Sequence, residues 1–253
     1  MAKATSRPRA QEGAVGTAIS PSAQVYADVG ATSPVQPANG DTLSGATTSD
    51  TLQTFTLDDL AQYTREGVFG PTASDVFRVF YVGRDDVHSV LKHLFSRVRL
   101  SVKMNMFGYD DDELNTILFG LVKDPTIMVQ VTLDKSQASG VHEKKILASN
   151  QANNPEAFAA DFVVGQSDTH QISHTKGGVL DGIVAFEGST NWSSSGEGTG
   201  ISLAAAKQHP GFKAQNNTLV VYISPYEIAK FSARLDYEHG VAARQPQPAL
   251  ATS

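Results

Sequence analysis

The sequence predicts an α/β domain in which helices flank a mixed, largely parallel β-sheet. Between residues 75 and 240, β-prone segments alternate with segments of helical periodicity. This order is typical of βαβ units. Asp181-Gly182 separates two apolar runs, which indicates a two-residue hairpin that we place near the centre of the sheet. A proline at 225 and a glycine at 240 favour a closing helix over residues 225–239.

The first half of the domain alternates strand and helix. Residues 75–81 (DVFRVFY) predict a strand, 85–98 an amphipathic helix, and 100–107 a second, alternating strand. Asp110, Asp111 and Asp112 then lead a helix that reaches about residue 122. Acidic residues suit the positive end of a helix dipole. We therefore interpret these aspartates as a helix cap and not as a metal site.

The second half continues the alternation and contains the hairpin. A β-branched strand is predicted over 126–133 and short helices over 143–150 and 155–160. Further strands follow at 162–165, 172–180 and 183–188.

The ends of the chain differ in composition from its middle. Residues 1–52 are rich in Ala, Ser, Thr, Gly and Pro and show no periodicity, which predicts a disordered, low-complexity tail. Residues 241–253 contain small residues and two prolines and predict a flexible C-terminal tail. One domain is expected over residues 53–240.

Composition excludes several classes of protein. The 253 residues include no cysteine, which excludes disulfides and thiolate metal sites. The sequence has no run of eighteen apolar residues and no apolar stretch after its basic start, so we expect neither a transmembrane segment nor a signal peptide. The compartment is left open, with the cytoplasm favoured.

One stretch, residues 174–191 (HTKGGVLDGIVAFEGSTN), combines residues that are typical of an active site. If residues 181 and 182 form the loop, strand alternation gathers polar side chains on one face. The predicted cross-strand pairs are Leu180 with Ile183, Lys176 with Glu187, and His174 with Ser189, and Asn191 joins this face if the strand continues.

This set of side chains suits a phosphate diester. Phosphoryl transfer needs a nucleophile, and it needs cations or hydrogen-bond donors for the phosphate oxygens. His174 can supply the first, and Lys176, Ser189 and Asn191 the second. A histidine can also form a covalent intermediate, so no metal or other cofactor is required.

The pattern H-x-K-x4-D-x6-G-S-x-N resembles the signature of the phospholipase D superfamily. Its six specified residues are His174, Lys176, Asp181, Gly188, Ser189 and Asn191. The resemblance implies a phospholipase D-like fold, a mixed sheet between helices, and a metal-independent phosphoric diester hydrolase that forms a phosphohistidine on His174. A histidine from a second motif would protonate the leaving group.

Only one complete motif is present. The triplet His142-Glu143-Lys144 repeats H-x-K but lacks the residues downstream, and we discount it. The second histidine would then come from another copy of the chain, as in the single-motif bacterial endonucleases that this sequence resembles. We expect a homodimer with its active site on the two-fold axis.

The sequence departs from the family pattern after the motif, where an acidic residue often orients the catalytic imidazole. Here Asn216 or Asn217 occupies that place, and an amide stabilises imidazolium less than a carboxylate does. Glu187 is a possible substitute. Asp181 is interpreted as structural, holding the turn through its own side chain, and Gly188 as a supporting residue.

Three functions are compatible with these sequence features. The first is a nuclease-type phosphodiesterase, although the net charge of −6 does not favour nucleic acid. A local basic surface could still bind nucleic acid, but these residues are explained at least as well as ordinary solvated charges. They are Arg78, Arg84, Lys92, Arg97, Arg99 and Lys103. The second is a phospholipase D, whose apolar rim could use Phe107, Tyr109 or Phe186. The third is a catalytically weak or inactive diester-binding scaffold.

Two aromatic residues near the motif have simpler explanations. His170 shares the alternating face of His174 if the strand reaches back that far, but a loop position is favoured. Trp192 follows the motif and could stack on a substrate, but a packing role is favoured.

Overall fold

The computed structural model describes residues 55–138, 140–198 and 214–247. The tail predicted over residues 1–52 lies outside these ranges. The elements, in chain order, are the 3-10 helix η2 (Asp58–Tyr63), β1 (Phe77–Tyr81), α1 (Val87–Ser96), β2 (Ser101–Met106), α2 (Asp112–Val122), β3 (Met128–Asp134), α3 (Val141–Asn153), α4 (Pro155–Asp161), β4 (Phe162–Gly165), β5 (Gly177–Leu180), β6 (Val184–Gly188), α5 (Ser194–Glu197), β7 (Thr218–Tyr222) and α7 (Pro225–Ala243).

The strands form one mixed sheet, in the order β1-β7-β6-β5-β2-β3-β4. Helices flank it, and the predicted hairpin of β5 and β6 lies at its centre, as expected. The prediction that the sheet is largely parallel was wrong. Of the six pairings between described strands, β2–β3 and β3–β4 are parallel and the other four are antiparallel. Helical crossovers connect β2, β3 and β4, so these three strands are parallel to one another. The hairpin strands β5 and β6, and then β7 and β1, each pair antiparallel with their neighbours.

The helices begin where the sequence supplies caps. The side chain of Asp86 accepts a hydrogen bond from the Ser89 N–H at the start of α1. Asp111 accepts from the Leu114 N–H at 2.7 Å in the same way at the start of α2. A carboxylate in this position satisfies one of the free N–H groups of the first turn. The predicted capping by the aspartate run is confirmed for Asp111.

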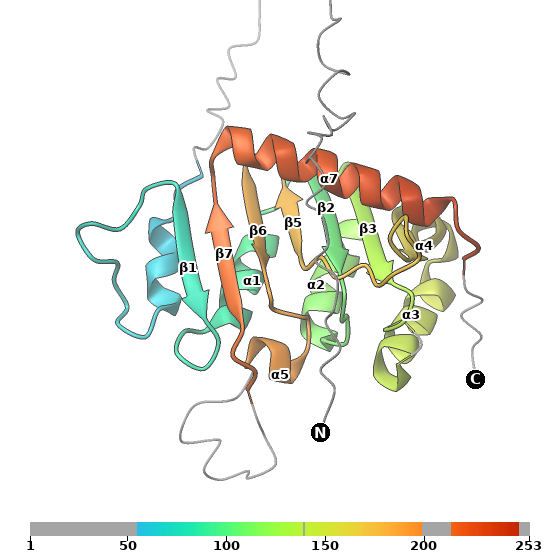
Figure 1. Ribbon diagram of the computed structural model, residues 1–253, viewed down its shortest axis with the longest axis horizontal. Helices are drawn as coiled ribbons and strands as arrows, with labels where there is room; N and C mark the ends of the chain where they lie inside the picture. The colour runs from blue at the N-terminus through green and yellow to red at the C-terminus, as the bar shows by residue number, and fades with distance from the viewer. Residues whose placement is uncertain (1–54, 139, 199–213, 248–253) are drawn as a thin grey trace, which may run out of the picture. The chain divides into compact units, whose positions relative to one another are not determined.

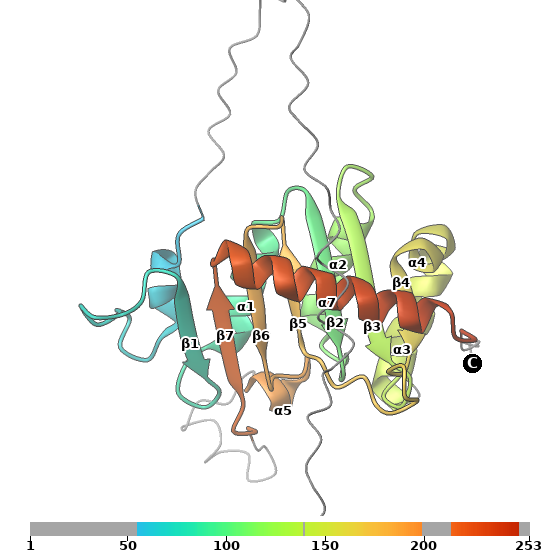
Figure 2. The same ribbon diagram turned by 45° about the horizontal axis from the view of Figure 1, so that its top comes forward.

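The two faces of the sheet carry different helices. Helix α7 crosses the strands on one face, and α1 and α2 lie on the other (Figures 1 and 2). The larger core fills the side of α1 and α2 and includes Leu91, Phe95, Met104 and Leu118. A smaller cluster under α7 joins Val179 and Ala185 of the hairpin to three helix residues, Ile228, Phe231 and Leu235. The hairpin is therefore packed on both faces.

The domain extends past the predicted boundary at residue 240. Helix α7 continues to Ala243, and Gly240 lies within it. The side chain of Gln247 accepts a hydrogen bond from the Val164 N–H at 2.8 Å. The side chain of Gln245 accepts from the Gln166 N–H at 2.9 Å and donates to the Gln166 carbonyl at 2.8 Å. Residues 241–247 are thus held against β4, and the remainder of the predicted tail, 248–253, lies outside the described residues.

Candidate active site

The hairpin has a loop one residue longer than predicted. Asp181 and Gly182 adopt positive φ values of 53° and 68°. Ile183 then joins the loop, its N–H donating to the Leu180 carbonyl at 3.1 Å. Leu180 consequently pairs with Val184, and Gly177 pairs with Glu187. The predicted pairs of Leu180 with Ile183, Lys176 with Glu187 and His174 with Ser189 were therefore wrong by one residue.

The side chain of Asp181 gives a reason for this register. Its carboxylate accepts hydrogen bonds from the backbone N–H groups of residues 99, 100 and 101, at distances from 2.8 to 3.2 Å. The loop is thus shaped by its attachment to the start of β2 as well as by local turn preferences. The Asp181 carboxylate therefore holds the start of a neighbouring strand, whereas the sequence predicts that it holds its own turn.

His174 and Lys176 lie in the segment that enters β5, ahead of the strand that was predicted to contain them. The His174 ring is exposed and meets the Phe107 ring edge-on, with 4.5 Å between centroids. Lys176 is only 5% exposed. Its Nζ donates to the His174 carbonyl at 3.0 Å and lies 4.7 Å from the centre of the Phe107 ring. Phe107 therefore brings the histidine and the lysine together.

A pocket of about 390 Å³ opens beside these two residues. The hairpin contributes Glu187 and Gly188 to its wall, and α7 supplies the opposite side. The helix residues that line it are Arg234, Tyr237, Glu238 and Val241. Arg234 is exposed and ion-paired to Glu238. The lining thus combines a histidine and two cationic side chains with three acidic ones, Asp168, Glu187 and Glu238.

Ser189 and Asn191 are not in the lining of this pocket. The Ser189 hydroxyl accepts a hydrogen bond from the Thr218 N–H at 3.0 Å. Asn191 Oδ1 accepts from the Gly108 N–H at 3.3 Å. Because Gly108 follows Phe107 in the chain, Asn191 is anchored next to the residue that His174 contacts. The hydroxyl hydrogen of Ser189 and the amide hydrogens of Asn191 can still donate to another acceptor.

Gly188 supports the site through its backbone. Its N–H donates to the Lys176 carbonyl at 3.1 Å, which extends the hairpin back to the lysine. A Cβ at this position would lie 2.0 Å from the Thr218 carbonyl oxygen. Only glycine lets β6 and β7 approach this closely.

The asparagines that replace the expected acidic residue do not line the pocket. Asn216 is exposed, and the Asn217 side chain donates to the Gly196 carbonyl at 2.9 Å. Both lie in the segment before β7.

Asp134, at the end of β3, is an acidic residue that sequence reasoning missed. Its side chain is fully buried. Oδ2 accepts from the Ser173 N–H at 2.6 Å, and Oδ1 accepts from the Ser136 N–H at 2.9 Å. Its charge raises the pKa values of both His174 and Lys176. The one available signal was its place at the carboxyl end of a parallel strand, where functional groups of α/β folds gather.

The surroundings set the protonation of the two motif residues. Burial of the ring and then the nearby Lys176 charge lower the pKa of His174 from its usual value, against the opposing effect of Asp134. Burial lowers the pKa of Lys176 to about 8, again against Asp134. Near pH 7, His174 is therefore mostly neutral and able to act as a nucleophile, and Lys176 is mostly cationic. Burial and then Glu238 raise the pKa of Glu187.

The remaining candidate residues lie in the core, in a turn or in a helix. Trp192 is fully buried, stacks on Tyr109 and meets Phe95 edge-on, so its role is packing. Tyr109 and Phe186 are buried in the core and form no rim. His170 is an exposed turn residue with a φ of 57°. The triplet that begins at His142 lies in α3.

The basic residues between positions 78 and 103 do not form a patch of free charge. The five that form ion pairs are Arg78 with Asp58, Arg84 with Glu66, Lys92 with Glu113, Arg97 with Asp59, and Lys103 with Asp236. The Arg99 guanidinium donates to the carbonyls of Ser96 and Val98. These contacts agree with the simpler explanation, in which the basic residues are ordinary charged residues of the fold and not a nucleic-acid surface.

Comparisons with known proteins find likenesses of structure. No protein-family model matches the chain, and no curated sequence does. Similar solved structures include Nuc from Salmonella typhimurium, described as a phospholipase D family member (14% identity, 68% of this chain and 98% of that chain, TM-score 0.49). NucT from Helicobacter pylori (14%, 64% and 94%, 0.45) and phosphatidylserine synthase from Haemophilus influenzae (10%, 67% and 40%, 0.49) are also similar. At these identities the likeness is one of fold.

Among the helices in the part of the chain that is described, none is long and apolar enough to cross a membrane.

Proposed function

We propose that this chain is a phosphodiesterase of the phospholipase D superfamily that cleaves a phosphate diester through a phosphohistidine on His174. The observation that carries the proposal is the placement of an exposed His174 ring and the Lys176 ammonium at one pocket, both in contact with Phe107. The spacing of the motif around them supports the same chemistry.

In the first step, a ring nitrogen of His174 attacks phosphorus, and the bond from phosphorus to the leaving oxygen breaks. In the second step, a second histidine, which has given its proton to the leaving oxygen, takes a proton from water. The water oxygen then bonds to phosphorus, and the bond from phosphorus to the His174 ring nitrogen breaks. Lys176 stabilises the negative charge that develops on the non-bridging oxygens. Ser189 and Asn191 would donate to the same oxygens once the phosphate is bound. Asp134 acts as a positioning residue, because it fixes the backbone of Ser173 beside the nucleophile.

The leaving oxygen needs a proton from a second acid. Among the described residues that line the pocket, His174 is the one histidine. We propose that His174 of a second copy supplies this proton across a two-fold axis, which makes the active enzyme a homodimer.

Nucleic acid is the substrate class that we propose. Arg234 and Lys176 offer cations to a phosphate backbone, and the exposed Tyr237 offers a ring on which a base could stack. A phospholipid is the second candidate, since Ile172 and Tyr237 are about half exposed, at 49% and 50%, in the pocket lining and would suit an apolar rim. Phe107 lies between the two motif residues in either case.

The first experiment measures turnover of bis(p-nitrophenyl) phosphate by the purified chain and by His174→Ala, each with and without EDTA. We expect metal-independent turnover that the variant loses. Single- and double-stranded DNA and RNA, and vesicles of phosphatidylcholine or phosphatidylethanolamine, then separate the two substrate classes. Silence of the wild type toward every diester over a broad pH range would contradict the proposal and favour a binding scaffold.

A second experiment tests the shared site. Wild-type and His174→Ala chains are co-expressed in known ratios, and activity is measured against the wild-type fraction. If each site needs both histidines, activity falls as the square of that fraction, to about one quarter at equal amounts. A linear fall to about one half, or a monomeric mass by light scattering, would contradict the dimeric site.

A further inference from the structure

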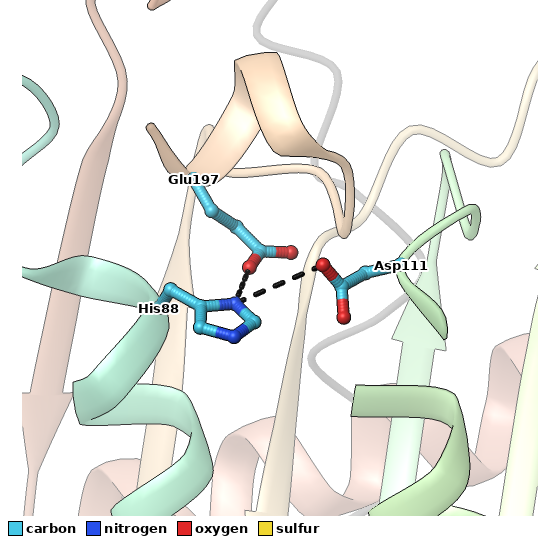
Figure 3. A group of neighbouring side chains, drawn as sticks. All are labelled: His88, Asp111 and Glu197. Atoms are coloured by element: carbon cyan, nitrogen blue, oxygen red, sulfur yellow. Dashed lines mark hydrogen bonds and ion pairs between the residues drawn. The ribbon is translucent and has the colours of Figure 1, made fainter. Parts of the chain in front are cut away.

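A second polar cluster lies away from the pocket and joins three distant parts of the chain. It consists of His88 in α1, Asp111 at the start of α2 and Glu197 at the end of α5. Figure 3 shows both carboxylates directed at the same edge of the imidazole ring. His88 Nδ1 is hydrogen-bonded to Glu197 Oε2 and lies 3.8 Å from Asp111 Oδ2.

We propose that His88, Asp111 and Glu197 form a structural binding site for a divalent transition-metal ion, with Zn²⁺ the best fit. One ligand atom from each residue lies within 4.8 Å of the others, and all three residues are buried. A histidine nitrogen and carboxylate oxygens are ordinary ligands for Zn²⁺. Ca²⁺ and Mg²⁺ prefer oxygen ligands alone, so the histidine argues against them.

The rest of the hydrogen bonding suits a ligand set. His88 Nε2 bonds Glu113 Oε2 at 2.9 Å, which is the carboxylate partner that metal-binding histidines commonly have on their other nitrogen. Asp111 uses Oδ1 to cap α2, which leaves Oδ2 for the cluster. This arrangement directs Nδ1 toward the ion and Nε2 toward Glu113.

Glu197 supplies an observation that the hydrogen bonds alone do not explain. Its side chain is fully buried, and its Oε1 has no hydrogen-bond partner. A buried carboxylate oxygen without a partner is unfavourable. If both oxygens bound the ion, this atom would be satisfied, and the site would reach four ligand atoms, the usual number for structural zinc.

The charge of the cluster also favours a cation. Two buried carboxylates face one imidazole, and the nearby Lys92 is paired with Glu113 and not with either of them. A divalent ion would displace the proton between His88 Nδ1 and Glu197 and would balance both carboxylates.

The test titrates Zn²⁺ into protein stripped by chelator, followed by calorimetry and thermal unfolding. We expect about one equivalent bound and a higher unfolding midpoint. Asp111→Asn removes a charged ligand but keeps a good helix cap, and Glu197→Gln keeps the shape of the side chain. Each variant should weaken binding by more than about 100-fold, and Glu113→Gln by roughly 10- to 100-fold, the usual range for an outer partner.

Two matched controls locate the ion. The Asp59 carboxylate is hydrogen-bonded at 2.9 Å to His93, which lies on α1 as His88 does. Asp59→Asn removes this carboxylate and should leave the Zn²⁺ affinity unchanged. His174→Ala should also bind normally, which separates this site from the proposed active site. Absence of stoichiometric binding, or equal binding by the wild type and both ligand variants, would overturn the proposal. If neither variant folds, NMR of the wild type decides, because bound Zn²⁺ must shift the His88 Nδ1 signal.

Discussion

His174 lies beside a cation, whereas His88 lies among carboxylates. Burial and Lys176 lower the pKa of His174, whose ring is open to a pocket. Burial opposes a charge on His88 as well, but the hydrogen bonds that its ring donates to Glu197 and Glu113 outweigh it and raise the pKa of His88 to about 9. Burial and a neighbouring cation thus favour the neutral form of His174, whereas the carboxylates favour a cation at His88, which is a proton on the ring or, in the proposed site, a metal ion in place of that proton. Because burial acts in the same direction on both rings, the opposite pKa shifts of the two histidines come from the opposite charges of their neighbours.

The largest effect on activity is expected from His174→Ala, which tests whether His174 is the reactive histidine of the two. If His174 is the nucleophile, turnover of a diester should fall on the order of 10⁴-fold or more. The exposed ring contributes little packing, so the unfolding midpoint should stay within error. His170→Asn is the matched control, because asparagine tolerates the positive φ of that turn and residue 170 does not line the pocket. An equal loss of turnover in both variants would show that disturbance of the segment before β5, and not removal of the nucleophile, lowers the activity.

Lys176 is the next test, with an expected loss of about 10²-fold or more in kcat for Lys176→Ala. The pKa of about 8 means that the ammonium is charged below pH 8 and loses its proton above it. Activity should therefore fall on the alkaline side, where Lys176 near pH 8 and the acid His174 of the second copy lose their protons, and on the acid side as the nucleophilic His174 takes up a proton. Lys176→Arg should remove the part of the alkaline fall that lies near pH 8, since arginine stays charged. An unchanged pH profile in this variant would remove Lys176 from the mechanism.

Asp134→Asn should have a smaller effect, a loss of roughly 10- to 100-fold in kcat, because the nucleophile would be held less well. Its negative charge raises the pKa values of His174 and Lys176. Without that charge both values fall, so both limbs of the pH profile should move to lower pH. A loss of rate with no shift of the limbs would indicate a structural role alone.

The smallest effect on activity is expected from a chelator. EDTA should leave the initial rate unchanged but lower the unfolding midpoint. If free zinc is present at about 100 times its dissociation constant, its binding stabilises the fold by about 2.7 kcal/mol, so its removal should lower the midpoint by about 5 °C or more. Rate and midpoint are measured on the same sample. Strong inhibition without loss of stability would reverse the roles of the two sites, placing a metal in the chemistry.

Much of the central domain could be predicted from the sequence, because its signals are local. The strands, helices and caps follow from periodicity and from residues such as Asp111 and Pro225. The direction of the strands could not be predicted, since it depends on which strands pair across the sheet. The predicted hairpin register was wrong for a related reason, because three backbone N–H groups that lie 80 to 82 residues away hold the Asp181 side chain.

The two polar sites differ in the same respect. His174 and Lys176 were found because they are two positions apart within a motif. Asp134 was missed, although it holds the residue next to His174, because it lies about forty positions earlier in the chain. His88, Asp111 and Glu197 are even more widely spaced and belong to elements that meet only in the folded domain.

The contact of Gln245 and Gln247 with β4 bears on the behaviour of the protein in solution. Strand β4 is at one edge of the sheet, where free backbone groups invite pairing with another chain. The two glutamine side chains occupy N–H groups of residues 164 and 166 and so act as a cover for that edge. A fragment cut at residue 240, where the sequence alone suggests that the domain ends, would lose this cover and expose the edge to self-association and aggregation.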